Sequence, residues 1–302
     1  MLFTFVRLTC LHPSLISVMA NKTEGIMNYY QNAFALSDRD FKELIGVEKE
    51  TFNAMVNVLQ EAYAEKHKRR GRHSKLSREQ QLFLALSYWR EYRTQKRLAF
   101  EFGVGEATAH ATIVWVEKTL IKSGKFSLPG KRALLEGGGI KNAIVDVTES
   151  PIERPKKAQA GWYSGKKKRH VIKTQLVVDA HTKEIIFTDH AEGSTHDFKL
   201  FQDSIGSAIS DSIKLQCDSG YQGISKFHKN SEIPKKKPKN GKLTAEEKLE
   251  NNRISRERVL IENINAKIKV FKITSSKYRN RRKRFGLRMS LICGIINFEN
   301  RS

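Results

Sequence analysis

Three acidic residues stand beside apolar runs, where a carboxylate needs a structural or chemical reason. Asp146 follows the apolar segment NAIV, and Asp218 follows IKLQC, with Gly220 just behind it to turn the chain. Glu262 lies among apolar residues of a helical pattern, which predicts that it faces a partly buried side. Ionised carboxylates in apolar surroundings are costly unless they are paired, hydrogen-bonded or bound to a metal.

The chemistry open to such a set is metal-dependent phosphoryl transfer. Mg²⁺ prefers oxygen ligands and retains water molecules. Two such ions about 4 Å apart can clamp the attacking and leaving oxygens of a phosphodiester. The three acids are remote from one another in the sequence, so spacing alone does not establish that they meet. The alternative is that they cap helices or form salt bridges in a basic protein.

Other potential metal ligands are weaker candidates. Asp197, in the segment STHDF, is the alternative for the second acid, although the start of a short helix already explains an acid at that position. Glu149 and Asp179 have still less support from their context. The remaining ligand types lack the short spacing that is typical of a zinc site; they are His181, His190, His196 and Cys217.

The second half of the chain has the pattern of a mixed α/β (α+β) domain, which we place at 140–302. Short runs rich in Val, Ile and Thr predict strands at 142–148, 170–179, 184–190 and 213–218. Helical patterns cover 258–271 and 286–298, so one sheet covered by helices is favoured. The polar segment at about 226–252 predicts an exposed, basic and partly helical insertion.

The first half is helical, and 27–126 is predicted to be a DNA-binding region. Within it, the stretch from about 77 to 120 has the plan of a helix-turn-helix. Ser77 and Gln80 form a capping-box pattern, Thr94 begins the next helix, and Gly103 supplies the turn. An ordinary helical hairpin is the alternative, because the following helix is not strongly basic. The residues that we expect that helix to present to a DNA groove are Glu106, Thr108, Ala109 and Thr112.

Residues 1–26 are predicted to be an unstructured extension, with Met27 as the alternative start. An arginine, a histidine and a proline interrupt the apolar run, and the positive start of a secretory signal is missing. No apolar stretch reaches the roughly 18 residues that a membrane-spanning helix needs. The three cysteines lie too far apart for a disulfide framework, which favours a reducing cytoplasm.

The charge of the chain indicates a polyanionic partner. Its 302 residues include 55 Lys and Arg against 32 Asp and Glu, a formal charge of +23, and the 39% of hydrophobic residues excludes a disordered chain. Nucleic acid and an anionic membrane surface both fit this charge. The basic tract at 66–75 is predicted to be a linker, and contact with phosphates is an equally supported interpretation. Two further tracts are expected to hold DNA phosphates; they contain Lys166, Lys167, Lys168 and Arg169, and Arg281, Arg282, Lys283 and Arg284.

Several motifs together resemble the DDE transposases of bacterial insertion sequences, in particular the insertion sequence 5 family, which is related to the eukaryotic Harbinger type. The motifs are IVDVTESPIERP, SGKKKRHVIKTQLVVD, GSTHDFKLF, CDSGYQG and RVLIENINAKIK, and the resemblance covers roughly 30–300. It implies a ribonuclease-H-like catalytic domain behind the helix-turn-helix. It also implies that the catalytic and metal-binding triad falls on Asp146, Asp218 and Glu262.

The family's glutamate motif matches Arg258, Glu262 and Lys269. The resemblance implies that the two basic residues of this motif contact DNA. Family members often have a tyrosine three residues before the arginine, and here that position is Ser255. This departure leaves the metal ligands intact but puts a tyrosine-dependent contact in doubt.

In function, the resemblance implies a transposase that binds the terminal inverted repeats of its element and uses two Mg²⁺ ions, with Mn²⁺ as the alternative. Water would cleave the DNA at those ends, and the freed 3′-hydroxyl would attack target DNA. Terminal-repeat and target DNA would be its partners, bound by a homodimer or higher assembly, with no membrane and no small-molecule substrate. The expected location is the bacterial cytoplasm, at the nucleoid. The alternatives are a catalytically inactive or domesticated sequence-specific DNA-binding protein, and a nuclease that cuts without joining.

Overall fold

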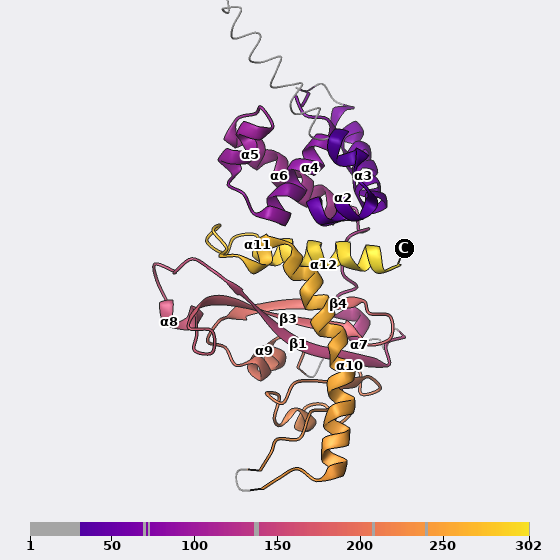
Figure 1. Cartoon of the computed structure of the whole chain (residues 1–302), viewed down its shortest axis with the longest axis vertical. Coiled ribbons are helices and arrows are strands. Elements are labelled where there is room, and N and C mark those ends of the chain that lie inside the picture. Colours follow the sequence, from indigo (N-terminus) through magenta and orange to yellow (C-terminus); the bar gives the residue numbers. More distant parts are fainter. Residues whose placement is uncertain are drawn as a thin grey trace, which may run out of the picture.

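A helical bundle and a mixed sheet make up the computed structural model, which describes residues 31–68, 71, 73–135, 139–206, 209–238 and 241–301. The helices of the N-terminal part lie on one side of the C-terminal helix α12, and the sheet lies on its other side (Figure 1). The extension predicted at 1–26 falls outside the described residues. Within the described ranges, no helix is long and apolar enough to cross a membrane.

The N-terminal bundle follows the capping signals of the sequence. Ser77 and Gln80 form the capping box of α4, Thr94 caps α5 by accepting the N–H of Arg97, and Gly103 has a φ of 61° in the turn before α6. The predicted helix-turn-helix is therefore formed by α5 and α6. The helices are α2 (Asp38–Ile45), α3 (Lys49–His67), α4 (Arg78–Glu91), α5 (Gln95–Glu101) and α6 (Glu106–Lys122).

The sheet combines an antiparallel meander with two parallel strands, as expected for a ribonuclease-H-like domain. Strands β1, β3 and β4 pair antiparallel, β5 and then β6 add in parallel on the other side of β1, and β2 pairs with the start of β3. The strands are β1 (Asn142–Pro151), β2 (Tyr163–Ser164), β3 (Arg169–Asp179), β4 (Ile185–Glu192), β5 (Lys214–Gln216) and β6 (Ser231–Glu232).

Two strand bounds differ from the sequence prediction. Strand β1 continues to Pro151 because it pairs with β3 along its length from Ala143 onwards, so Asp146 lies in the middle of the strand and not at its end. Strand β5 ends at Gln216, which leaves Asp218 in the turn that follows.

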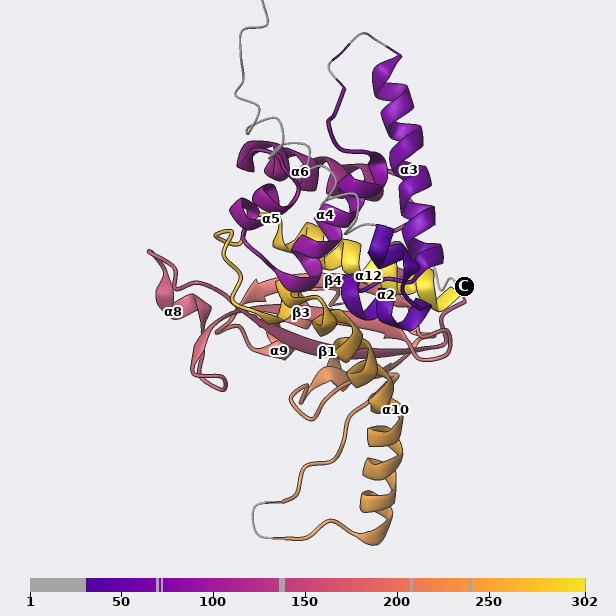
Figure 2. The same ribbon diagram turned by 45° about the horizontal axis from the view of Figure 1, so that its top comes forward.

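The long helix α10 begins inside the segment that was predicted to be a basic insertion. Thr244 and Glu247 form a capping box at its start, and its first turns project away from the sheet (Figure 2). The predicted segment is therefore helical from Ala245 onwards. The remaining helices are α7 (Arg132–Leu135), α8 (Gln159–Trp162), α9 (Asp197–Ser204), α10 (Ala245–Val270), α11 (Lys272–Ser275), α12 (Phe285–Arg301) and a 3-10 turn at Ile224–Lys226.

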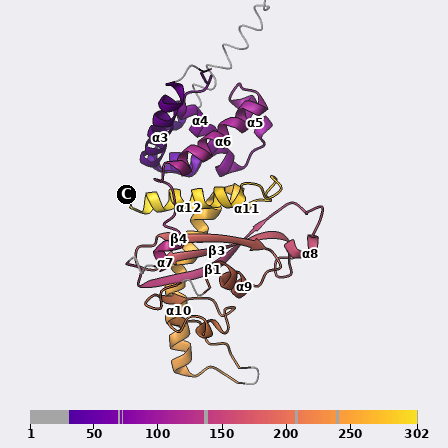
Figure 3. The ribbon, with the colours of Figure 1, turned by 180° about the vertical axis from the view of Figure 1, so that it is seen from behind.

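The two faces of the sheet belong to different cores. On β1, Ile144 packs toward α10, α12 and the helical bundle, whereas Ala143 and Val145 pack toward α9 on the opposite face. Figure 3, which shows the molecule from behind, places α9 on the side of the sheet away from α12. This alternation follows from the period of two along a strand. Asp146 has the same parity as Ile144, so its side chain projects toward α10.

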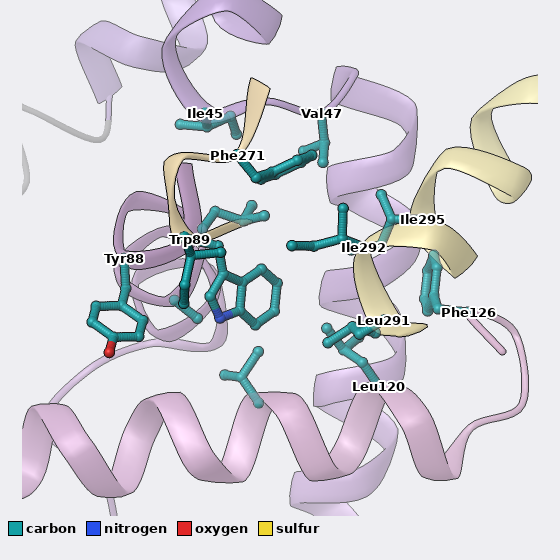
Figure 4. Packing of buried hydrophobic residues seen from close by; sticks show 14 of the residues in the cluster. Ile45, Val47, Tyr88, Trp89, Leu120, Phe126, Phe271, Leu291, Ile292 and Ile295 are labelled. Atoms are coloured by element: carbon teal, nitrogen blue, oxygen red, sulfur yellow. The ribbon is translucent and has the colours of Figure 1, made fainter. Parts of the chain in front are cut away.

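Helix α12 is the layer shared by both halves of the chain. Leu291, Ile292 and Ile295 of this helix pack with Trp89 of α4 and Leu120 of α6 in one apolar cluster (Figure 4). At Gly294 the helix passes so close to the backbone that an added Cβ would lie 2.1 Å from the carbonyl oxygen of Phe126. The contact between the two halves therefore resembles a protein core.

Candidate active site and DNA-binding surfaces

Asp146 and Asp218 are brought together by strand pairing. Strands β1 and β5 run parallel, with Ile144 opposite Gln216. Each acid follows this pair by two residues, so both lie toward the same end of the sheet. The structure therefore confirms that two acids remote in the sequence meet in space.

Helix α10 supplies the polar groups that face these acids. The guanidinium of Arg258 bridges them, with Nη2 3.4 Å from Oδ1 of Asp146 and Nη1 3.5 Å from Oδ1 of Asp218. Asn265 donates its Nδ2 to Oδ2 of Asp146 at 3.0 Å. Arg258, which was predicted to contact DNA, thus pairs with both acids of the candidate site.

Glu262 occupies the same stripe of α10 but does not reach the pair. Positions 258, 262, 265 and 269 follow the helical spacing of three and four residues, so they share one face of the helix. Glu262 is exposed, which contradicts the prediction of a partly buried position. The reason is that Ile261 and Ile264 take the inward positions on either side of it.

Burial shapes the electrostatics of this site. The Asp146 side chain is 21% exposed and that of Arg258 17%, whereas that of Asp218 is 47% exposed. Burial raises the pKa of the Asp146 carboxyl above its ordinary value, and the charge of Arg258 offsets this only in part. Cys217, adjacent to Asp218, is fully buried, and burial raises the pKa of its thiol, which makes it a poor nucleophile.

A cleft of about 480 Å³ opens beside Asp146 and has a basic rim. Of the residues predicted to bind DNA, Lys166, Lys167, Arg169 and Lys269 line this cleft. Lys168 lies in the same turn with a φ of 52° and is exposed. The rim is therefore assembled from the turn between β2 and β3 and from the end of α10.

The alternative acid, Asp197, has a structural role. It is the first residue of α9, and its Oδ1 accepts a hydrogen bond from Nζ of Lys173 at 2.8 Å. The same lysine donates to the carbonyl of Thr195 at 2.6 Å. Asp179 caps a turn through the N–H of His181. Both acids thus have partners within the protein, and Asp197 also lines the cleft beside Asp146.

The donor set suits a hard divalent cation, although the full triad is not assembled. Asp146 and Asp218 offer carboxylate oxygens, and Oδ1 of Asn265 is buried beside them without a hydrogen-bond partner in the described part of the chain. All are oxygen donors of the kind that Mg²⁺ prefers. Across the described residues, however, no three His, Cys, Asp or Glu side chains lie close enough to hold an ion.

The second basic tract connects the two halves of the chain. Arg284 forms an ion pair of 2.6 Å with Glu117 of α6, which is fully buried, and Arg288 pairs with the same carboxylate at 2.6 Å. The guanidinium of Arg282 lies 4.4 Å from the ring centroid of Trp162. Arg284 is therefore paired with a carboxylate within the protein, while Arg281 and Lys283 remain exposed.

The helix-turn-helix presents a different face from the one predicted. Thr108 and Glu106 are exposed at the start of α6, as expected, but Ala109 is fully buried and Thr112 is 6% exposed. Those two residues pack inward because they share the face of Ile113 and Val116, which carries the core contacts of the helix.

Sequence reasoning missed Asn265 and Lys173. Asn265 has no charge to mark it, but its spacing of seven residues from Arg258 places it on the stripe that faces Asp146. Lys173 stands in the middle of an apolar strand and pairs with Asp197. A lysine in such a strand is itself a signal that an acid lies nearby.

Comparisons with known proteins agree with this architecture. Residues 145–297 match the family described as DDE superfamily endonuclease, and residues 74–126 match the helix-turn-helix of DDE superfamily endonuclease. The chain therefore belongs to the DDE superfamily endonucleases, a class that implies the use of divalent metal ions. It is 47% identical over 270 residues to a probable transposase for insertion sequence element IS702 from Microchaete diplosiphon, a match that covers 89% of this chain and 97% of that protein. The family and the fold class predicted from the motifs are confirmed.

Proposed function

We propose that the chain is a DNA transposase with a helical DNA-binding region at 27–126 and a catalytic domain at 140–302. The first region binds the terminal inverted repeats of an insertion sequence, and the second cleaves the DNA at those ends and joins it to target DNA. The observation that carries the proposal is the meeting of Asp146 and Asp218 opposite the stripe of α10 that bears Glu262. The 47% identity to a probable transposase supports it.

In this proposal, Asp146, Asp218 and Glu262 hold the divalent cations. Bound there, the cations supply Lewis-acid stabilisation of the charge that develops on the phosphodiester. Glu262 joins the two aspartates by turning its exposed side chain along the helix face that it already shares with Asn265. Asn265 fixes the orientation of the Asp146 carboxylate through the hydrogen bond to its Oδ2.

The basic rim holds the DNA. Lys166, Lys167 and Arg169 come from the turn between β2 and β3, and Lys269 comes from the end of α10. All four line the same cleft as Asp146, so a sugar-phosphate backbone bound to them passes close to that carboxylate. Such contacts position the duplex and carry no sequence information. Sequence selection therefore falls to the helix-turn-helix, whose exposed face begins at Thr108.

The test uses the purified full chain, Mg²⁺ or Mn²⁺, and a supercoiled plasmid carrying both ends of the element. We expect nicks at the terminal repeats and products joined to target DNA. Asp146→Asn, Asp218→Asn and Glu262→Gln should each reduce cleavage to background while leaving DNA affinity in place. Asp203→Asn is the matched control, because Asp203 is an exposed acid paired with Lys199 on α9.

Three results would count against the proposal. Undiminished cleavage by Asp146→Asn would remove that residue from the site. Specific binding to the terminal repeats without cleavage under any divalent metal would favour a catalytically inactive DNA-binding protein. Cleavage without joined products would indicate a nuclease of the same fold.

A further inference from the structure

A second groove, of about 490 Å³, lies in the N-terminal helical bundle. None of the residues that line it lines the cleft beside Asp146. One wall is the outer face of α6 with the turn before it, including Thr108 and Trp115. The opposite wall is the end of α3, with Lys66 and His67, and residues 73–76, with His73 and Lys75. The groove therefore runs along the helix that the helix-turn-helix plan assigns to DNA.

The wall opposite α6 is held in place by a stack of planar groups. The guanidinium of Arg78 lies 3.5 Å from the ring centroid of Tyr63, and the ring of His67 lies 3.9 Å away from the same ring. His73 continues the stack at 4.8 Å from His67. The hydroxyl of Tyr63 accepts the N–H of Ser74 at 3.1 Å, which ties the segment after α3 back to that helix.

The groove is strongly cationic. Lys66 and Lys75 are exposed at its edge, and none of the described residues that line it is acidic. Neither lysine has an ion-pair partner within the described part of the chain. Two ammonium groups without an acidic partner at the edge of a groove favour an anionic ligand.

We propose that this groove seats the sugar-phosphate backbone of one DNA strand while α6 lies in the adjacent major groove. Lys66 and Lys75 contact phosphates from the side of α3, and the hydroxyl of Thr108 faces the same strand from α6. A helix inserted in a major groove is flanked by phosphate backbones, so a cationic wall parallel to it meets one of them. The proposal deepens the DNA binding proposed above and rests on it.

The experiment measures the affinity of the full chain for two duplexes, one from the ends of the element and one of unrelated sequence, over a range of salt concentrations. Each lost phosphate contact lowers the slope of log K against log salt by about 0.9. Lys66→Gln/Lys75→Gln should therefore lower that slope by about 2 on both duplexes, because phosphate contacts are independent of sequence. The matched control is Lys118→Gln/Lys122→Gln, which removes two exposed lysines of α6 that do not line the groove.

The outcomes separate the two proposals. If the unmodified chain binds neither duplex, the proposed function fails and this inference fails with it. If the unmodified chain binds and the groove variant keeps the slope of the control variant, the groove is not a backbone site although the proposed function stands. A loss confined to the terminal duplex, with an unchanged slope, would mean that the groove reads bases, and it would also overturn the inference. Equal thermal unfolding of both variants excludes a folding defect.

Discussion

The hydrogen bond from Asn265 to Asp146 makes a side chain without charge a positioning residue of the candidate site. We predict that Asn265→Ala lowers metal affinity and cleavage by about 10- to 100-fold, the range found when a group that orients a ligand is removed. Metal titration by Mn²⁺ binding and the cleavage rate at saturating metal measure the two effects separately. Asn263→Ala, an exposed amide on the same helix, is the control, and an equal effect of both variants would contradict the prediction.

A second prediction at this scale concerns His190 on β4. Burial lowers its pKa to about 4, below its ordinary value of 6.5. Its folded-state pKa is depressed, so the unfolded chain takes up a proton first as the pH falls from 6.5 to 4, and stability is lost in that window. The uptake of this one proton lowers the free energy of unfolding by about 1.4 kcal/mol for each pH unit in that window.

His190→Gln should therefore flatten the pH dependence of the free energy of unfolding between pH 6.5 and 4, as measured by denaturant titration at several pH values. The exposed His181 provides the control substitution His181→Gln. A slope that is unchanged by the first substitution would show that His190 does not remain neutral in the folded chain.

A residue of the candidate site could be predicted from the sequence only where it carries a charge in an unusual local context. Asp146 and Asp218 stand out because each follows an apolar run, whereas Glu262 is a candidate only through its match to the family motif. The role of Arg258 was not predictable, because its choice between a phosphate and two carboxylates depends on the packing of α10 against β1. Asn265 was missed because an amide in a polar helix stripe carries no distinctive signal.

At the scale of elements, α6 and α12 are joined by Glu117, which is fully buried between Arg284 and Arg288. Trp89 of α4 also donates its ring N–H to this carboxylate at 3.2 Å. Removing one partner of a buried charge pair leaves the other charge without compensation. The contact is therefore a strong link between the DNA-binding and catalytic halves.

We predict that Glu117→Gln destabilises the chain by about 3–5 kcal/mol, because two guanidinium groups lose their counter-charge. Denaturant unfolding measures the change. Glu43→Gln breaks an exposed pair with Arg39 and should cost no more than about 1 kcal/mol. Similar losses for the two variants would mean that water compensates the buried arginines.

Element type was predictable from the sequence, but element partners were not. The capping box at Ser77 and the run of Val, Ile and Thr in β3 are local signals, so the type of these elements could be predicted. The basic tract before α12 was assigned to DNA because its carboxylate partner, Glu117, is 167 residues away from Arg284. Similarly, the true length of β1 depends on its register with β3, which no local pattern encodes.

For the whole molecule, α12 joins the helical bundle and one face of the sheet in a single core. Its apolar residues fill the helical bundle, while the same helix also covers β4 of the sheet. A fragment of 31–126 would expose the surfaces of Trp89 and Leu120 that α12 buries (Figure 4). Burial of apolar surface is the main source of stability, so the fragment loses much of its driving force to fold.

We predict that the 31–126 fragment has no cooperative thermal transition, whereas the full chain has one. Near-ultraviolet circular dichroism of the Trp89 environment and a thermal melt provide the measurements. A sharp transition of the fragment close to that of the full chain would contradict the prediction, since it would mean that the bundle needs nothing from α12.

The close approach of Gly294 to the backbone at Phe126 sets a limit on how such enzymes can be recombined. In a chimera that carries the helical bundle of a relative, α12 would face a different surface. One additional methyl group at this contact is enough to prevent α12 from packing against the bundle. Successful retargeting of this protein to other DNA ends would thus require α12 to be transplanted together with the helical bundle, even though the two segments are far apart in the sequence.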